Sequence, residues 1–90
     1  MNTKDTYVNN RYMFCVGVAE GGKYYISILV SNSRVDYEEY YELESEIYDR
    51  VPSNIDELKK IADRCRRRKN DSRLLELPGR DRGEPFWPEE

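Results

Sequence analysis

The residues with the clearest chemistry form one acidic stretch, residues 36–49, with the sequence DYEEYYELESEIYD. The stretch contains seven acidic side chains, four tyrosines and no basic residue. Carboxylates attract a positively charged partner, and tyrosine offers a large, rigid contact area with a polar tip, so it is enriched at protein interfaces. The pattern therefore predicts a surface for a basic protein partner. The alternative is an ordinary solvated strand whose tyrosines pack inward.

The position of each side chain along this stretch selects the candidate contacts. Residues 35–43 are predicted to form a strand, in which alternate side chains share a face. Tyr41 and Leu43 then point inward, while the intervening side chains point outward together. The residues expected to contact the partner are Glu38, Tyr40, Glu42, Glu44, Glu46 and Tyr48. Phe86 and Trp87, in a proline-flanked tail, either close the core or add further contacts to the partner.

The chain lacks most of the residue combinations that enzymes commonly use for catalysis. There is no histidine, so neither a Ser-His nor a Cys-His nucleophile pair can form. There is no glycine-rich phosphate-binding loop, and two cysteines without histidine do not make a zinc site. Paired carboxylates need environments that separate their pKa values, which a solvated acidic stretch does not provide. We expect no enzymatic activity, no metal and no other cofactor.

A second charged segment has the opposite sign. Residues 59–73 hold eight basic and two acidic side chains, and residues 64–69 read RCRRRK. A basic cluster on a helix can neutralise phosphates, so a small nucleic-acid-binding regulator is the alternative function. However, cations at the end of a helix also stabilise the helix itself. Because the pI is about 5.1 and residues 36–49 would repel phosphate, we do not expect nucleic-acid binding.

Length and composition predict one folded domain over residues 1–90. The chain is 38% hydrophobic, 37% charged and 12% aromatic, and so many aromatic residues argue against disorder. No apolar run approaches the length of a membrane span, and the N-terminus lacks the apolar core of a signal peptide. We therefore expect a cytoplasmic protein that does not enter a membrane. Cys15 and Cys65 are expected to be free thiols, mostly buried.

Most strands are predicted from short apolar or alternating runs. Residues 1–10 are polar, and we expect a loose N-terminal arm or a short edge strand there. Residues 12–19 and 24–31 are rich in β-branched and aromatic residues, and Gly21-Gly22 between them predicts a tight hairpin turn. The third strand is predicted at residues 35–43.

Two helical segments follow the third strand. Ser45 is predicted to cap a short helical turn that runs through Arg50. The longest helix is predicted at Ser53–Lys69, where the pattern Ser53-x-x-Asp56 resembles a capping box. Its apolar side chains fall on one stripe. They are Ile55, Leu58, Ile61, Ala62 and Cys65.

The last part of the chain completes the predicted fold. Residues 73–77 (RLLEL) are predicted to form a short fourth strand, and residues 80–90 an irregular C-terminal tail. The element order is then β-β-β-α-β. This order predicts an α+β domain, in which an antiparallel sheet of about four strands packs one face against the main helix.

The layout and texture of residues 12–87 resemble those of bacterial immunity proteins, which neutralise toxins of contact-dependent inhibition and other polymorphic toxin systems. The resemblance rests on YYELESEIYDRV leading into an amphipathic helix, followed by DSRLLELPGRDRGEPFW. It implies a cytoplasmic inhibitor that binds one cognate toxin, commonly a basic nuclease, and blocks its active site or a neighbouring surface. No family site residue is carried over. A related alternative is a phage-encoded DNA mimic that blocks a nuclease.

Overall fold

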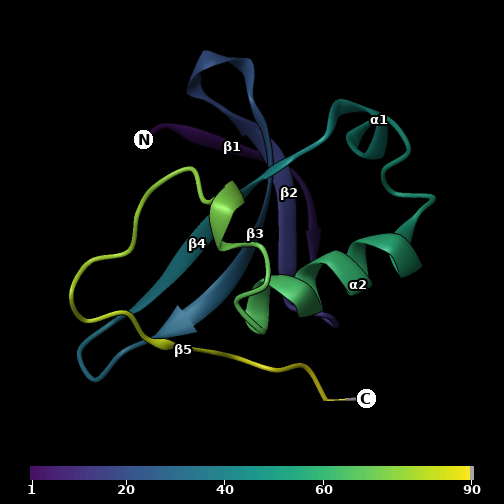
Figure 1. Cartoon of the computed structure of the whole chain (residues 1–90). Coiled ribbons are helices and arrows are strands. Elements are labelled where there is room, and N and C mark those ends of the chain that lie inside the picture. The colour runs from purple at the N-terminus through teal and green to yellow at the C-terminus, as the bar shows by residue number, and fades with distance from the viewer. Residues whose placement is uncertain (90) are drawn as a thin grey trace.

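Figure 1 shows the computed structural model of the chain, which describes residues 1–89; Glu90, the last residue of the predicted tail, lies outside the described residues. The strands are β1 (Thr3–Asn9), β2 (Phe14–Ala19), β3 (Tyr24–Ser31), β4 (Asp36–Leu43) and the two-residue β5 (Glu84–Pro85). The helices are α1 (Ser45–Tyr48) and α2 (Ile55–Arg66), and short 3-10 turns cover Glu20–Gly22 and Asp71–Arg73. The predicted α+β class, with an antiparallel sheet and one main helix, is confirmed.

The first four strands form an antiparallel meander in the order β1-β2-β3-β4 (Figure 1). The pairing of β3 with β4 runs from Tyr24 opposite Leu43 to Ser31 opposite Asp36. The hairpin between β2 and β3 turns at the two predicted glycines, whose φ angles are +84° and +82°. Glycine adopts these positive angles without a steric penalty, which explains why this turn could be predicted.

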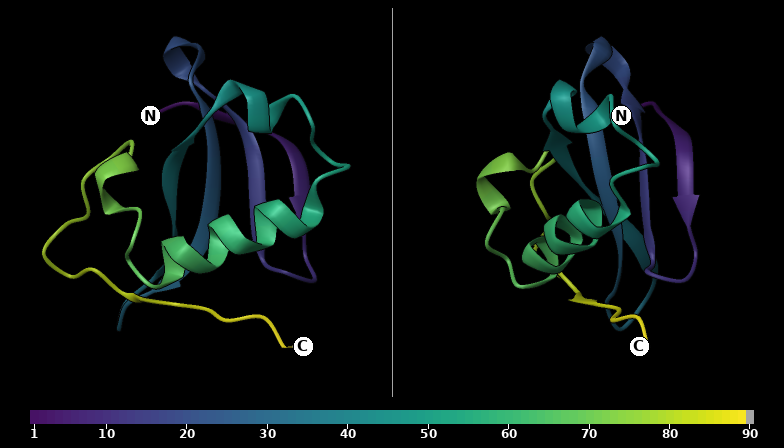
Figure 2. Two further views of the ribbon diagram at one scale, coloured as in Figure 1. Left: turned by 45° about the vertical axis from the view of Figure 1, so that its right-hand side comes forward. Right: turned by 90° about the vertical axis from the view of Figure 1, so that its right-hand side faces the viewer.

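Helix α2 lies across one face of the sheet (Figure 2). Its apolar stripe buries Leu58, Ala62 and Cys65 against the strands. The buried residues that the sheet adds to this core are Phe14, Val16, Ile26, Ile28, Val30, Tyr41 and Leu43. Removal of this apolar surface from water is the main force that holds the helix on the sheet.

The N-terminal segment is an edge strand rather than a loose arm. β1 pairs with β2 from Thr3 opposite Ala19 to Asn9 opposite Phe14, with a bulge between Asp5 and Tyr7. Most of its side chains are exposed, so the strand is held chiefly through its backbone hydrogen bonds. A polar sequence does not reveal such pairing, and of the two alternatives for residues 1–10 the edge strand is the correct one.

The predicted fourth strand at residues 73–77 is wrong. The segment makes a single bridge to β4, between Leu74 and Tyr41, and the N–H of Leu75 donates to the carbonyl of Tyr40 at 2.9 Å. It then leaves the sheet: Leu77 is 88% exposed, and the next residue, Pro78, has no N–H to donate. The strand that brings the meander to four is β1, at the N-terminal end of the chain.

The start of helix α2 also differs from the prediction. The helix begins at Ile55, and Asn54 occupies the N-cap position. Ser53 does not form the predicted capping box, because its hydroxyl donates to the carbonyl of Arg50 at 2.6 Å. The same hydroxyl therefore closes the preceding turn instead of capping the helix.

The end of α2 and both ends of α1 also differ from the prediction, and α1 ends at Tyr48 rather than at Arg50. Helix α2 ends at Arg66 rather than at the predicted Lys69, because Arg68 adopts a left-handed conformation with φ +60°. Ser45 is the first residue of α1, and the N-cap position that it was predicted to hold belongs to Glu44.

Candidate functional site

The sheet face opposite α2 is the candidate binding surface, and we call it the open face. Among residues 1–89, no helix covers this side of the strands (Figure 2). Strand register and alternation determine which side chains point to it. They are Thr3, Asp5 and Val8 from β1; Cys15, Gly17 and Ala19 from β2; Tyr25, Ser27, Leu29 and Ser31 from β3; and Asp36, Glu38, Tyr40 and Glu42 from β4.

The charge of the open face has one sign. Its outward positions include four carboxylates and no lysine or arginine. Lys23, in the β2–β3 turn, lies at the margin of this face, 3.8 Å from the carboxylate of Glu42. Both side chains of this pair are about half exposed, so water screens their attraction. The face therefore presents a negative potential to solvent.

Two tyrosines make a rigid platform beside these carboxylates. Tyr25 is fully buried although it points away from the helix, because its ring lies over Gly17 and its hydroxyl donates to Asp5. A Cβ at Gly17 would overlap with this ring, so the close approach requires glycine. Tyr40 packs edge-on against Tyr25, with 5.0 Å between ring centroids.

The hydroxyl of Tyr40 holds the carboxylate of Glu38. It donates to Oε2 of Glu38 at 2.9 Å, and the hydroxyl of Ser27 donates to Oε1 of the same residue at 3.1 Å. Partial burial, with the adjacent Glu38 carboxylate, raises the pKa of Tyr40 to about 12. The phenol is therefore neutral and a proton donor at physiological pH. Two neutral donors thus fix the position of an exposed carboxylate.

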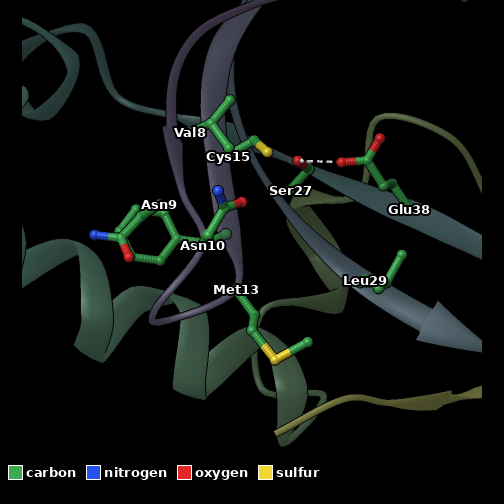
Figure 3. A pocket seen from close by; sticks show the side chains of 9 residues that line it. Val8, Asn9, Asn10, Met13, Cys15, Ser27, Leu29 and Glu38 are labelled. Carbon is green, nitrogen blue, oxygen red and sulfur yellow. Dashed lines mark hydrogen bonds between the residues drawn. The ribbon is translucent and has the colours of Figure 1, made fainter. Parts of the chain in front are cut away.

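A depression of about 200 Å³ lies on the open face next to this carboxylate. Cys15, Ser27 and Glu38 point into it from three neighbouring strands, and the hydrogen bond between Ser27 and Glu38 crosses its upper part (Figure 3). The remaining lining residues are Val8, Asn9, Asn10, Met13, Phe14 and Leu29. The depression is thus mainly apolar, with a carboxylate at its edge.

Cys15 is the only group in the depression that could act as a strong nucleophile, and the structure keeps it neutral. Partial burial and the negative charges of Asp5 and Glu38 raise the pKa of its thiol to about 11. The thiolate, not the thiol, is the nucleophilic form, so almost none is present at pH 7. Cys15 and Cys65 are both free; Cys65 is buried, as predicted, and Cys15 is partly exposed.

Comparison of the chain with protein-family models, curated proteins and solved structures found no match. Within residues 1–89, no cluster of three or more histidine, cysteine or acidic side chains is arranged to hold a metal ion. No helix in the same range is long and apolar enough to cross a membrane.

The structure divides the six predicted contact residues into two groups. Glu38, Tyr40 and Glu42 lie together on the open face. The other three follow the end of β4, where the chain turns into α1 toward the helix side of the sheet. Tyr48 stacks on Tyr24, with ring centroids 4.0 Å apart, and its hydroxyl lies 3.0 Å from the hydroxyl of Thr6.

The two glutamates near this turn are exposed, but they do not extend the open face. Glu44 forms an ion pair with Arg73 at 3.0 Å, and Glu46 lies on the surface of α1. The sequence predicted a helical turn after the strand, but it did not specify the direction of the chain after Leu43 and so kept Glu44, Glu46 and Tyr48 among the contacts. Only the part of the stretch in β4 contributes to the candidate site.

One acidic residue of the stretch at residues 36–49 has a structural role. Glu39 is 6% exposed, and the guanidinium of Arg82 binds both of its oxygens, at 2.9 and 3.0 Å. The same guanidinium binds both oxygens of Asp71, at 2.8 and 2.9 Å, and the hydroxyl of Tyr41 donates to Glu39 at 2.8 Å. These bonds lower the pKa of Asp71 and raise that of Arg82. The network fastens the C-terminal tail to the sheet.

Within residues 80–89 the tail is irregular apart from β5, but it is attached to the sheet. β5 pairs with the end of β3, where Pro85 lies opposite Val30. Gly83 is buried against the backbone of Ser31, where a Cβ would overlap with the carbonyl. This contact and the Arg82 network explain the path of the tail, and an arginine between Asp81 and Gly83 gave no sequence signal for it.

Phe86 and Trp87 do not close the core, since they are 37% and 48% exposed. The N–H of Phe86 donates to the carbonyl of Leu29 at 3.1 Å, which places the backbone of Phe86 next to a residue that lines the depression. Trp87 lies instead against the end of α2, with its ring 5.2 Å from the guanidinium carbon of Arg67. Of these two predicted additional contacts, Phe86 adjoins the open face and Trp87 does not.

The basic end of α2 is partly used inside the molecule. The side chain of Arg66 is 1% exposed and donates to the carbonyls of Tyr12 and Met13 at 2.7 and 2.9 Å. Arg68 donates to the carbonyl of Gly83 at 2.6 Å. Two of the arginines that suggested nucleic-acid binding therefore hold the β1–β2 loop and the tail.

Proposed function

We propose that this chain is a protein-binding inhibitor of the immunity-protein type, which neutralises a cognate basic toxin in the cytoplasm and is not itself an enzyme. The open face, centred on Glu38, Tyr40 and Glu42, would cover the toxin's surface. The single observation that carries the proposal is the composition of this face. It has four carboxylates, a rigid tyrosine pair and an apolar depression, and none of its outward positions is basic.

Complementary charge supports this function. A face with one sign of charge attracts a partner of the opposite sign, which raises the association rate and rejects wrong partners. Nucleases carry basic surfaces because they must approach phosphate backbones. A nuclease-type toxin is therefore the partner that best matches this negative face.

The tyrosines support a stable complex rather than a transient encounter. Tyr40 is already packed against Tyr25 and bonded to Glu38, so it loses little conformational freedom when a partner covers it. Val8, 51% exposed at the edge of the depression, adds apolar area that a partner could bury. Aromatic anchors surrounded by polar groups are typical of the residues that dominate binding energy.

The nucleic-acid alternative has weaker support. Arg66 and Arg68 bind backbone carbonyls of this chain, and Arg67 stacks on Trp87. Arg64, Arg67 and Lys69 remain exposed at the end of α2, which is a small electrostatic footprint for a phosphate backbone. The acidic open face would oppose the same ligand.

Co-expression with a toxin tests the proposal. The gene next to that of this protein should encode a large secreted toxin, and the toxin domain produced alone should stop cell growth. We expect co-expression of this chain to restore growth and the two proteins to purify together as a complex. Tyr40→Ala should weaken the complex by faster dissociation, at a cost of about 2 kcal/mol or more.

A matched control separates the surface from net charge. Glu38→Lys with Glu42→Lys reverses two charges on the open face, whereas Glu20→Lys with Asp49→Lys reverses two exposed charges elsewhere. The first pair should lose protection and the second should keep it. Full protection by the open-face variant, or no growth rescue by the natural sequence, would reject the proposed function.

A further inference from the structure

Glu38 differs from the other glutamates of β4 in how it is held. Glu39 binds Arg82 and Glu42 lies near Lys23, so both have a cation of this chain. Within the described residues, no lysine or arginine lies within ion-pair distance of Glu38; two neutral hydroxyls hold it instead. Its carboxylate has lone pairs left for further donors, since each oxygen accepts only one of these two bonds. Glu38 is thus a positioned anion without its own cation.

The depression beside Glu38 offers the complementary apolar contact. Val8, Met13 and Leu29 line it from β1, the β1–β2 loop and β3 (Figure 3). Its volume of about 200 Å³ lies below the ~300–1,000 Å³ of typical small-molecule sites. The depression is therefore of a size for one long side chain rather than for a cofactor.

We propose that this depression receives a single arginine side chain of the partner protein, with the aliphatic stem against Val8, Met13 and Leu29 and the guanidinium on the carboxylate of Glu38. The inference deepens the proposed function and rests on it for the identity of the partner. It makes the depression the central anchor point of the open face.

Arginine fits these groups better than lysine does. Its planar guanidinium donates two parallel hydrogen bonds to the two oxygens of one carboxylate, and a fixed carboxylate favours this geometry. Ser27 and Tyr40 supply that fixed position through their bonds to Glu38. Arginine is also enriched at the cores of protein interfaces, where lysine is depleted.

The thiol of Cys15 provides a reporter inside the depression that needs no partner. Its thiolate attacks a methanethiosulfonate reagent, forms a mixed disulfide and releases methanesulfinate. We would compare the rate for the cationic aminoethyl reagent with that for the anionic sulfonatoethyl reagent at pH 8.5. Because both reagents attack the same thiolate, the ratio of their rates cancels any change in thiolate fraction. Mass spectrometry of the labelled peptide separates Cys15 from the buried Cys65.

The expected ratio follows from the negative charges of Asp5 and Glu38 beside the thiol, of which the Glu38→Gln variant removes one. The cationic reagent should react roughly fivefold faster or more, and Glu38→Gln should reduce this preference severalfold. Asp49→Asn removes one exposed carboxylate at the C-cap position of α1, outside the open face, and should leave the ratio unchanged. A ratio near one, or equal effects of the two variants, would overturn the proposal.

Protection by arginine then tests the side chain itself. Acetyl-arginine methylamide should slow labelling of Cys15 by a neutral methanethiosulfonate at least threefold more than the lysine analogue or the uncharged citrulline analogue does. Equal protection by lysine would overturn the choice of arginine, and equal protection by citrulline would overturn the role of Glu38. Protection by arginine that persists in Glu38→Gln would also refute it.

These outcomes are distinguishable from failure of the proposed function. The labelling experiments use only the purified chain, so their result does not depend on any toxin. Suppose that the charge-reversed variant no longer rescues growth, while arginine does not slow the labelling of Cys15. The open face then binds a partner without this anchor, and the further inference alone is wrong. If arginine protects Cys15 but no toxin is neutralised, the proposed function alone is wrong.

Discussion

Arg82 provides the sharpest test of how the tail is held, and the change to make is Arg82→Met. Its guanidinium makes four hydrogen bonds to the carboxylates of Glu39 and Asp71, each 2.8–3.0 Å long. Methionine keeps much of the aliphatic stem and removes the charge. The variant therefore leaves the buried carboxylate of Glu39 without a cation.

The expected loss of stability follows from the burial of this network. Removing one partner of a buried ion pair costs about 3–5 kcal/mol, because the other charge stays buried and unpaired. Arg82 is 18% exposed, and the hydroxyl of Tyr41 still donates to Glu39, so we expect the lower end, about 3 kcal/mol. A domain of this length has only about 5–13 kcal/mol of net stability. The variant should fold, but with a clearly lower urea midpoint.

The assay is urea unfolding of a double-mutant cycle with Glu39→Gln. The double variant should be less destabilised than the sum of the single variants by about 2 kcal/mol, because no unpaired buried charge remains. Arg73→Met is the matched control: its ion pair with Glu44 is about half exposed and should contribute less than about 1 kcal/mol. Equal losses for the two arginine variants, or additive effects in the cycle, would refute this reasoning.

Three further predictions concern the open face, the thiols and the basic helix end. Gly17→Ala should destabilise the fold by about 1–3 kcal/mol in urea unfolding, since the added methyl meets the backbone carbonyl of Lys4 and the ring of Tyr25; a loss below about 0.5 kcal/mol would show that both neighbours move aside freely. Burial raises the pKa of both Cys15 and Cys65 from 9.0 to about 11, so the unfolded chain loses these protons first. Stability should be complete below pH 9 and fall as pH rises through about 11, with a shallower fall in Cys15→Ala; urea midpoints that stay constant over this range would contradict it. The chain should show no measurable binding to duplex DNA or RNA at physiological salt; micromolar binding that weakens steeply with salt and is lost in Arg67→Ala would contradict the account.

The strands and the helix that bury apolar residues could be predicted from the sequence, because the spacing of their apolar residues indicates which face is buried. The hairpin at Gly21-Gly22 and the inward positions of Tyr41 and Leu43 followed from turn chemistry and period-two alternation. β1 could not be separated from a loose arm, since its backbone pairs with β2 while its side chains stay exposed. The segment at residues 73–77 had the composition of a strand, but its backbone leaves β4 after the hydrogen bond from Leu75 to Tyr40.

The candidate site was only partly visible in the sequence for a related reason. The alternation in β4 placed Glu38, Tyr40 and Glu42 on one face, and the structure brings them together. The residues from other strands, such as Asp5 and Cys15, join that face through sheet register, which one sequence does not specify. The internal role of Glu39 depended on Arg82, 43 residues away, and no local pattern connects them.

Association kinetics with the neutralised toxin test the central claim most directly. Glu38→Lys with Glu42→Lys should slow association about tenfold or more at low salt and flatten its dependence on ionic strength. Glu20→Lys with Asp49→Lys, which changes the net charge equally, should alter the association rate by no more than about twofold. Equal slowing by both variants, or no slowing by the first, would show that the open face does not bind the partner.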